Sequence, residues 1–224
     1  MTTKDKVLEN KSNCKQLVQV ACFIDWNSQL LLTKIDYIRD PLNTARLAFK
    51  QTMRKIACRL SEIDSKLQFM VSIRLYHGWH KGYEQTANMK AVRKVIAETD
   101  FAVVSEKQGV FFTENVGWGS CLLSALPSRY HQSLGIHLPN TLRNKSKKGH
   151  EEKMVDTALA ADLVFSACND PSAWIILVTE DDDLIPPLFI AESIVVPKSA
   201  RAVLLSNRRH AGNFLKLAGL ESQG

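Results

Sequence analysis

The run LVQVACFID, from Leu17 to Asp25, constrains the fold more strongly than any other stretch of the sequence. Its residues are nearly all apolar, and several of them are β-branched. A strand without regular alternation of apolar and polar residues is typical of a parallel sheet that helices cover on both faces. The run therefore predicts an α/β fold organised around a buried strand.

The segments that follow alternate between helix and strand patterns. Asp40 and Pro41 supply an N-cap and a first-turn proline for a helix whose apolar face is Phe49, Met53, Ile56 and Leu60. The other expected elements are strands at 69–79, about 101–104, after Gly109, 173–179 and 201–207, and helices at 83–100, 155–167, 188–195 and 210–220. This order predicts a mostly parallel central sheet with helices on both faces.

The length of 224 residues suits one sizeable α/β domain, which we expect to span 17–224 after a flexible arm at 1–16. The arm is polar and lacks the apolar core of a signal peptide. No run of about eighteen apolar residues predicts a membrane span. Five separated cysteines without a CxxC pair favour a reducing cytoplasm and argue against a zinc site. Residues 121–149 have poor periodicity and are expected to form a long connection that ends in a basic loop.

Acidic and polar residues gather where two expected strands end. Asp25 and Asn27 follow the first strand, and the later strand runs into TEDDD, which places Thr179, Asp181 and Asp183 at its tip. Functional sites of open parallel sheets lie beyond the carboxyl ends of the strands. If the chain stays extended, side chains two apart share a face, so Asp181 and Asp183 are expected to point together, with Glu180 and Asp182 turned away.

A third source of carboxylates is the helix VDTALAADLVFSA. Six helical residues turn through about 600°, so Asp156 and Asp162 would lie about 120° apart around the axis and could not face one centre. If Asp156 is instead the N-cap, one of the two acids could bind a metal ion and the other could support it; a plain helix cap is the simpler alternative. For Asp162 the simpler alternative is a surface position, although its apolar neighbours argue against full exposure.

Converging carboxylates raise one another's pKa unless a cation neutralises them. Oxygen ligands of this kind suit Mg²⁺ or Mn²⁺. The net charge is +6, and the segment from Arg143 to Lys153 holds five basic residues and two acidic ones. A basic surface beside an acidic cluster suggests a polyanionic substrate held near a metal ion, although charge alone favours a solvated surface.

Three blocks of the sequence, FIDWNS, KMVDTALAADL and LVTEDDDLIPPL, resemble the signature blocks of the NYN domain family, which belongs to the PIN-like nuclease superfamily. That family has a strand ending in Asp-x-Asn, a Val-Asp…Asp helix, and a strand ending in Ser-Gly-Asp-x-Asp. The tail RAVLLSNRRHAGNFLKLAG also resembles the family's last strand and helix. The resemblance spans most of 18–217, but the segment 101–148 is not recognisable. It implies a PIN-like Rossmannoid fold and metal-dependent cleavage of RNA.

The resemblance also assigns residues by position. It implies that Asp25, Asp156, Asp181 and Asp183 are catalytic, metal-binding carboxylates, with Asn27, Asp162 and Thr179 as supporting residues. The sequence departs from the family pattern at Ser28, where many members have Asn, and at Glu180, where Gly is usual.

RNA is the expected partner, and single-stranded DNA and a homo-oligomeric state are left open. The candidate RNA-binding residues are Arg143, Lys145, Lys147, Lys148 and Lys153. The basic loop could clamp a phosphate backbone or simply be disordered, and Lys153 could position a phosphate or balance the carboxylates. Trp79, between His77 and His80, could stack on RNA, although ordinary surface histidines are the simpler interpretation. Trp118 could contact a base, but anchoring of its loop is the favoured interpretation.

Two other functions are compatible with the same sequence. One is a catalytically inactive module that binds RNA or protein on the same fold; the complete set of carboxylates argues against it. The other is a phosphatase of the haloacid-dehalogenase type, which requires Asp-x-Asp at the first strand, whereas the pair here is Asp25 and Asn27. No phosphate loop, dinucleotide loop or GxSxG motif is present.

Overall fold

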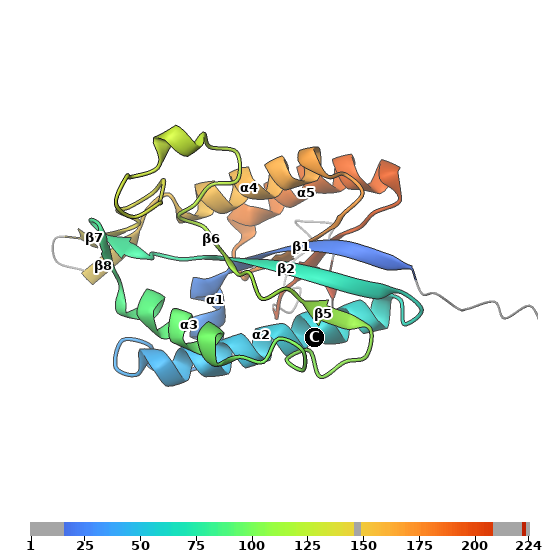
Figure 1. Cartoon of the computed structure of the whole chain (residues 1–224), viewed down its shortest axis with the longest axis horizontal. Helices are drawn as coiled ribbons and strands as arrows, with labels where there is room; N and C mark the ends of the chain where they lie inside the picture. The colour runs from blue at the N-terminus through green and yellow to red at the C-terminus, as the bar shows by residue number, and fades with distance from the viewer. Residues whose placement is uncertain (1–15, 146–148, 208–220, 223–224) are drawn as a thin grey trace, which may run out of the picture.

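A computed structural model describes residues 16–145, 149–207 and 221–222. Within them the sheet has the strand order β11-β10-β9-β1-β2-β5, and β6 also pairs with β2. Every recorded pairing in this sheet is parallel. In Figure 1, α4 and α5 lie on one side of the sheet, and α1, α2 and α3 lie on the other. The prediction of an α/β fold with a mostly parallel sheet and helices on both faces is confirmed.

The strands of the sheet are β1 (Leu17–Asp25), β2 (Gln68–Tyr76), β5 (Val110–Phe112), β6 (Gly117–Trp118), β9 (Trp174–Val178), β10 (Ala202–Leu205) and β11 (Glu221–Ser222). The α-helices are α1 (Trp26–Leu32), α2 (Pro41–Ile63), α3 (Ala87–Glu98), α4 (Val155–Asn169) and α5 (Ile185–Val195), with short 3₁₀ helices η1 (Pro127–Arg129), η2 (Asp182–Leu184) and η3 (Val196–Lys198). Two antiparallel hairpins complete the described chain, β3 (His80–Lys81) with β4 (Glu84–Gln85) and β7 (Leu142–Lys145) with β8 (Gly149–Glu152).

Local sequence explains how the main helices begin. The Asp40 side chain accepts the backbone N–H of Asn43 and so caps α2, whose predicted apolar face is buried. Thr86 caps α3 by accepting the N–H of Met89 at 3.3 Å. That cap makes the predicted start of this helix at residue 83 wrong, because 84–85 form β4 and the helix begins only at Ala87.

Two other expectations about local structure need correction. The short strand predicted at 101–104 is a series of turns, because the Asp100 side chain accepts the N–H of Ala102 at 2.9 Å and its carbonyl accepts those of Val103 and Val104. Helix α1 follows β1 directly and was not predicted. The predicted arm at 1–16, all but its last residue, the tip of the basic loop at 146–148 and the predicted final helix at 210–220 lie outside the described residues.

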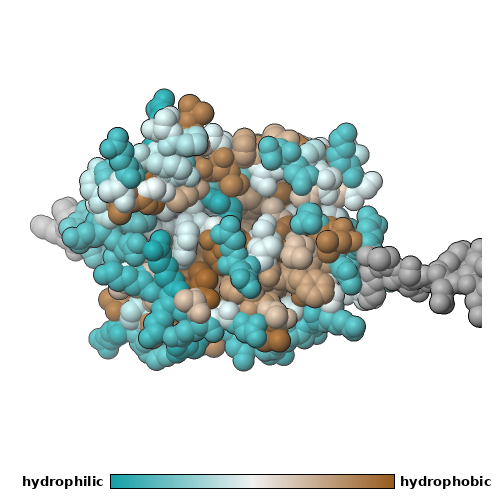
Figure 2. All heavy atoms as spheres, viewed as in Figure 1, coloured by the Kyte–Doolittle hydropathy of each residue, from teal (hydrophilic) through white to brown (hydrophobic). Residues whose placement is uncertain are grey.

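One face of the sheet is covered unevenly. Hydrophobic residues gather in Figure 2 over the first halves of β1, β2 and β5, where Leu17 is 48% exposed and Phe111 is 43% exposed. The opposite, carboxyl ends of β1 and β2 lie toward the β7–β8 hairpin (Figure 1).

No helix in the described part of the chain is both long and apolar enough to cross a membrane.

Candidate active site

The predicted acidic residues lie where the chain reverses its direction across the sheet. From β1 the chain passes to β2 and β5 on one side, and it returns to β9 on the other side of β1. The connections from β1 and β9 therefore leave on opposite faces of the sheet, so the carboxyl ends of these strands form its topological switch point, where such sheets bind ligands. Asp25 ends β1, and Thr179 follows β9 directly.

Asp25 is held by hydroxyl groups from both strand ends. Its carboxylate accepts hydrogen bonds from the Ser28 hydroxyl and from Thr179 Oγ1, the latter at 2.9 Å. Ser28 also donates its backbone N–H at 3.3 Å, so Asp25 is the N-cap of α1. Burial raises the pKa of Asp25, and the charge of Glu152 adds to the rise, while the bonds from Ser28 and Thr179 oppose it.

Thr179 connects Asp25 to the acidic run. Its hydroxyl donates to Asp25 and accepts the backbone N–H of Asp181 at 2.9 Å. Asp181 in turn caps η2 by accepting the N–H of Asp183 at 3.0 Å. The extended backbone expected through Asp183 is therefore wrong, since the chain turns into a 3₁₀ helix at Asp182. Asp181 is half-buried and Asp183 is exposed.

Asp156 lies in the first turn of α4 and is not the N-cap, which is Met154 in a left-handed conformation with φ of 67°. Its pKa is raised to about 6, first because neighbouring protein atoms displace water from it, and then by the charges of Asp25, Asp181, Glu152 and Asp183. The charges of the other three carboxylates expected at the metal site therefore act on Asp156. All four were predicted from three separate blocks of sequence, and the fold brings them to one edge of the sheet.

Glu152 is a fifth carboxylate of this edge, and sequence reasoning missed it. Its Oε1 accepts the backbone N–H of Gly78 at 2.5 Å and lies 2.5 Å from Nδ1 of His77. Burial opposes ionisation of Glu152, but the charge of His77 and these contacts lower its pKa. Because His77 directly follows β2, which pairs with β1 up to Asp25 and Tyr76, Glu152 is fixed beside the end of β1. In the sequence it is one of two adjacent glutamates beside a lysine, a pattern also typical of solvated surface.

The His77 ring is itself oriented from the other side. Its Nε2 lies 2.8 Å from the amide nitrogen of Asn88, in the first turn of α3. The other ring nitrogen, Nδ1, faces Glu152 at 2.5 Å. Asn88, His77 and Glu152 thus form a chain of contacts that ends at the acidic edge.

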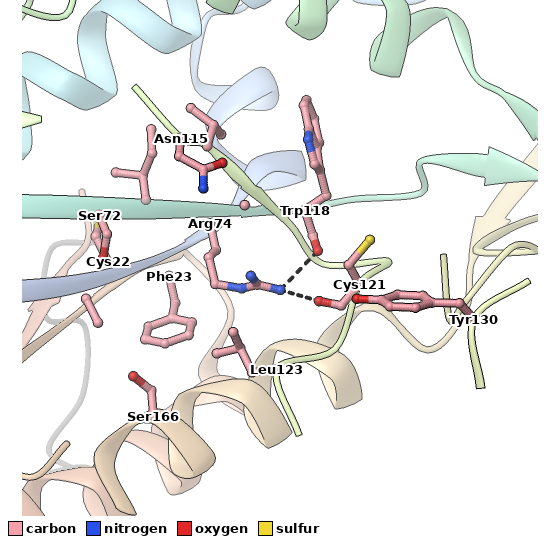
Figure 3. Close-up of a pocket in the computed structure, with 14 residues that line it drawn as sticks. Cys22, Phe23, Ser72, Arg74, Asn115, Trp118, Cys121, Leu123, Tyr130 and Ser166 are labelled. Carbon is pink, nitrogen blue, oxygen red and sulfur yellow. Dashed lines mark hydrogen bonds between the residues drawn. The ribbon is translucent and has the colours of Figure 1, made fainter. Parts of the chain in front are cut away.

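Asp162 does not face the same centre. It is fully buried, and it accepts hydrogen bonds from Tyr76 Oη at 2.8 Å, from the N–H of Leu123 at 2.8 Å and from Arg74 Nη2 at 3.2 Å. The same Arg74 group donates to the carbonyl oxygens of Trp118 and Cys121 (Figure 3). Arg74 also lines a cavity of about 570 Å³ between the sheet, α4 and the segment after β6. Asp162 therefore anchors the irregular segment to the sheet, and the expected 120° separation from Asp156 agrees with these positions.

The remaining polar residues of the acidic run have separate positions. Glu180 turns away from the cluster, as expected, but it accepts hydrogen bonds from Ser206 Oγ and the N–H of Asn207, both at 2.7 Å, and so fixes the end of β10. Asn27 is half-buried within α1 and has no recorded hydrogen bond to the described acidic residues. Asp182 is exposed.

The aromatic and histidine candidates pack inside the protein. Trp79 is fully buried and donates its indole N–H to the carbonyl of Leu75 at 3.1 Å, and His77 and His80 are also buried. The suggested stacking of Trp79 on RNA and the surface position of both histidines are therefore wrong. Trp118 packs edge-on against Trp79 at 5.1 Å, which confirms its anchoring role.

The predicted RNA-binding residues belong to the β7–β8 hairpin and the turn after it. Arg143 is exposed on β7, opposite Glu151 of β8. Lys153 is exposed, and its Nζ lies 3.1 Å from Glu151 Oε1, so it balances at least that carboxylate. The backbone of Lys145 ends β7, while Lys147 and Lys148 lie outside the described residues.

The donor atoms at this edge suit a hard divalent cation, because they are carboxylate and hydroxyl oxygens. The negative charges of the neighbouring carboxylates contribute to the raised pKa of Asp156, and a bound cation would offset their repulsion. In the geometry of the described chain, however, no three acidic, histidine or cysteine side chains lie close enough together to hold one metal ion. Cation binding would therefore require side-chain adjustment, which the exposed Asp156 and Asp183 allow.

The fold and the acidic edge together define an α/β protein with a doubly wound parallel sheet and a group of carboxylates at its switch point. Comparison of the chain with known proteins assigns it to no family. No protein-family model, curated protein or solved structure matches it.

Proposed function

We propose that this protein is a metal-dependent endoribonuclease that hydrolyses RNA phosphodiester bonds, with a PIN-like domain of the NYN type. One observation carries the proposal. Asp156 sits among the charges of Asp25, Glu152, Asp181 and Asp183, and its pKa is raised to about 6 at the switch point of a parallel sheet. A carboxylate whose pKa is strongly perturbed by burial and by neighbouring charges is a common mark of a functional site.

The residues proposed to hold Mg²⁺ or Mn²⁺ are Asp25, Asp156, Asp181 and Asp183. A divalent cation supplies positive charge that offsets the carboxylates and polarises both a phosphate oxygen and an attacking water. Ser28 and Thr179 orient Asp25 from two strand ends. Because these hydroxyl groups are themselves fixed by backbone N–H groups of Glu180 and Asp181, the position of Asp25 is set before substrate binds.

RNA is favoured as substrate by charge as well as by resemblance. The net charge of +6 and the exposed Arg143 and Lys153 near the acidic edge suit a polyanion that approaches a metal-binding site. We infer that Arg143, Lys145, Lys147, Lys148 and Lys153 contact phosphates of the strand. The separated cysteines support a reducing, cytoplasmic environment.

The proposal is tested by incubating the purified protein with single-stranded RNA, structured RNA and single-stranded DNA, each with Mn²⁺, with Mg²⁺ or with a chelator. We expect internal cleavage of RNA only when a divalent cation is present. Asp181→Asn should reduce the rate at least a hundredfold, a loss typical of one electrostatic group in an active site. The matched control is Asp182→Asn, because Asp182 is adjacent and exposed.

The outcomes separate the proposed functions. Cleavage that survives both the chelator and Asp181→Asn would exclude a metal-dependent nuclease at this site. RNA binding without cleavage under any cation would instead favour the inactive binding module. Cleavage of DNA but not of RNA would correct the substrate.

A further inference from the structure

A second, smaller pocket lies beside the acidic edge, and most of its lining residues are polar, the apolar ones being Leu32 and Ala48. It has a volume of about 300 Å³ and is formed by α1, α2 and Asn207, which lies two residues after the end of β10. Its polar walls are Gln29, Gln51, Thr52, Lys55 and Asn207. At roughly 30 Å³ per water molecule, the space accommodates a phosphate group with part of a sugar.

One side chain of this pocket has an unmet hydrogen-bonding requirement. Gln29 is only 4% exposed, and its amide nitrogen has no hydrogen-bond partner. Its oxygen accepts the hydroxyl of Thr52 at 3.4 Å, so the nitrogen is the free end of the amide. A buried donor without an acceptor is costly, and it indicates that an acceptor is supplied from outside the described protein.

The pocket also contains a partly desolvated cation. Lys55 Nζ donates to Asn207 Oδ1 at 2.7 Å, which leaves two of its three hydrogens for other acceptors. Burial lowers the pKa of Lys55, and the charge of Glu180 opposes that shift. Donors from Gln29 and Lys55 therefore line one small space, and an anionic group rich in acceptors is the ligand chemistry that satisfies them.

The pocket is joined to the acidic edge by short contacts. Ser28 donates to Asp25 and accepts the N–H of Glu180 at 3.3 Å, and Gln29 is the next residue of α1. Glu180 accepts the N–H of Asn207, which holds Lys55. A strand whose scissile phosphate lies at the carboxylates would thus bring a neighbouring phosphate toward Lys55.

We propose that this pocket binds a backbone phosphate of the nucleic-acid strand, adjacent to the phosphate that is cleaved, with Lys55 supplying charge and Gln29 a hydrogen bond. The inference rests on the proposed function, because it presumes that the acidic edge receives a phosphodiester. It assigns to Lys55 a positioning role in binding and no part in bond cleavage. Phosphate contacts of this kind set the register of a strand without reading its sequence.

The test measures binding of a labelled single-stranded oligoribonucleotide by fluorescence anisotropy, in an Asp181→Asn background with Mg²⁺ so that cleavage does not intervene. Lys55→Gln should weaken binding roughly fivefold to tenfold at low salt, equally for different sequences. The slope of log affinity against log salt should fall by about 0.7, which corresponds to one lost phosphate contact on a single strand. Lys55→Arg should restore most of the slope.

The matched control is Lys50→Gln, since Lys50 is exposed on the same helix and contacts Glu106 at 3.9 Å, outside the pocket. Melting curves of the Lys55 variants establish that each is folded. Gln29→Leu gives an independent second variant, which should weaken binding without changing the salt slope, because it removes a neutral donor. An unchanged affinity and slope in Lys55→Gln would overturn the inference.

Two further comparisons distinguish failure of the proposed function from failure of this inference. If the parent protein binds no oligonucleotide and cleaves none, the proposed function fails; if it binds and cleaves RNA but Lys55→Gln behaves like the parent, only this inference fails. Inorganic phosphate is the probe for a free-anion site. Stabilisation by phosphate that depends on Lys55, with RNA affinity unchanged, would overturn the assignment to a strand.

Discussion

Asp156 and Asp162 belong to one helix and yet serve different purposes, and the difference lies in what surrounds each carboxylate. Asp162 is buried with Arg74, Tyr76 and the N–H of Leu123, so its charge is matched by donors. Burial raises the pKa of Asp156 to about 6, and the charges of the carboxylates around it add to the rise. A paired acid indicates a structural role, whereas an acid held among like charges indicates a site that binds a cation.

The raised pKa of Asp156 leads to a prediction about stability and pH. An unfolded aspartate has a pKa near 3.9, so between about pH 4 and pH 6 the folded state binds the proton more tightly, and stability falls as pH rises through that window. With a chelator present, Asp156→Asn should therefore be more stable than the parent by about 1 kcal/mol at pH 8, a value that allows for solvent screening of this exposed group. Near pH 4 the two proteins should be equally stable. Urea denaturation at both pH values measures the difference.

The control for that measurement is Glu114→Gln, which neutralises an exposed acid of the irregular segment. It should change stability little at either pH. A pH-independent effect of Asp156→Asn would mean that the carboxylates do not repel one another in solution.

At the scale of secondary-structure elements, α4 connects two parts of the protein. Its first turn presents Asp156 to the acidic edge, and its middle presents Asp162 to β2 and to the segment after β6. That segment contains little regular structure, and the Arg74–Asp162 pair fixes it through the carbonyl oxygens of Trp118 and Cys121. The pair thus stabilises a long connection that has few ladder hydrogen bonds of its own.

Removal of one partner should be costly for this segment. Asp162→Ala leaves the Arg74 guanidinium without its counter-charge, and loss of one partner of a buried pair costs about 3–5 kcal/mol. We expect a lower urea midpoint and faster proteolysis around η1, with Asp162→Asn less affected because it retains an acceptor. Equal stability of Asp162→Ala and the parent would contradict the anchoring role.

Sequence reasoning succeeded where periodicity and burial determine structure. β1 and β9 were predicted from their apolar runs, and α2 from its cap and its helical spacing. The four aspartates were predicted as site residues because carboxylates follow the strand ends and because the order of the blocks resembles a known family.

What could not be predicted depends on contacts between distant segments. Glu152 belongs to the acidic edge only because His77 and Gly78 bind it across the fold, and nothing local in EEK indicates that. The turn at Asp182 likewise depends on the Asp181 side chain accepting the N–H of Asp183. The proposed phosphate-binding role of Gln29 depends on its buried amide nitrogen having no partner and on its place in a pocket between α1 and α2.

At the scale of the whole molecule, the sheet topology concentrates negative charge on a chain whose net charge is +6. β1 contributes Asp25, the residues after β9 contribute Asp181 and Asp183, and α4 contributes Asp156, so the cluster exists only when the central sheet is assembled. A cation that binds all of them binds only the folded state. Binding and global stability are therefore linked.

This linkage predicts that Mn²⁺ or Mg²⁺ raises the melting temperature at pH 8. A ligand present at 100 times its dissociation constant stabilises by about 2.7 kcal/mol, which for a chain of this length corresponds to a shift of about 5–10 °C. Asp156→Asn and Asp181→Asn should each reduce the shift, whereas Asp182→Asn should retain it. Because protons compete for Asp156, the shift should also shrink at pH 5, below its pKa of about 6. A shift that is equal in all four proteins and at both pH values would place the cation elsewhere on the surface.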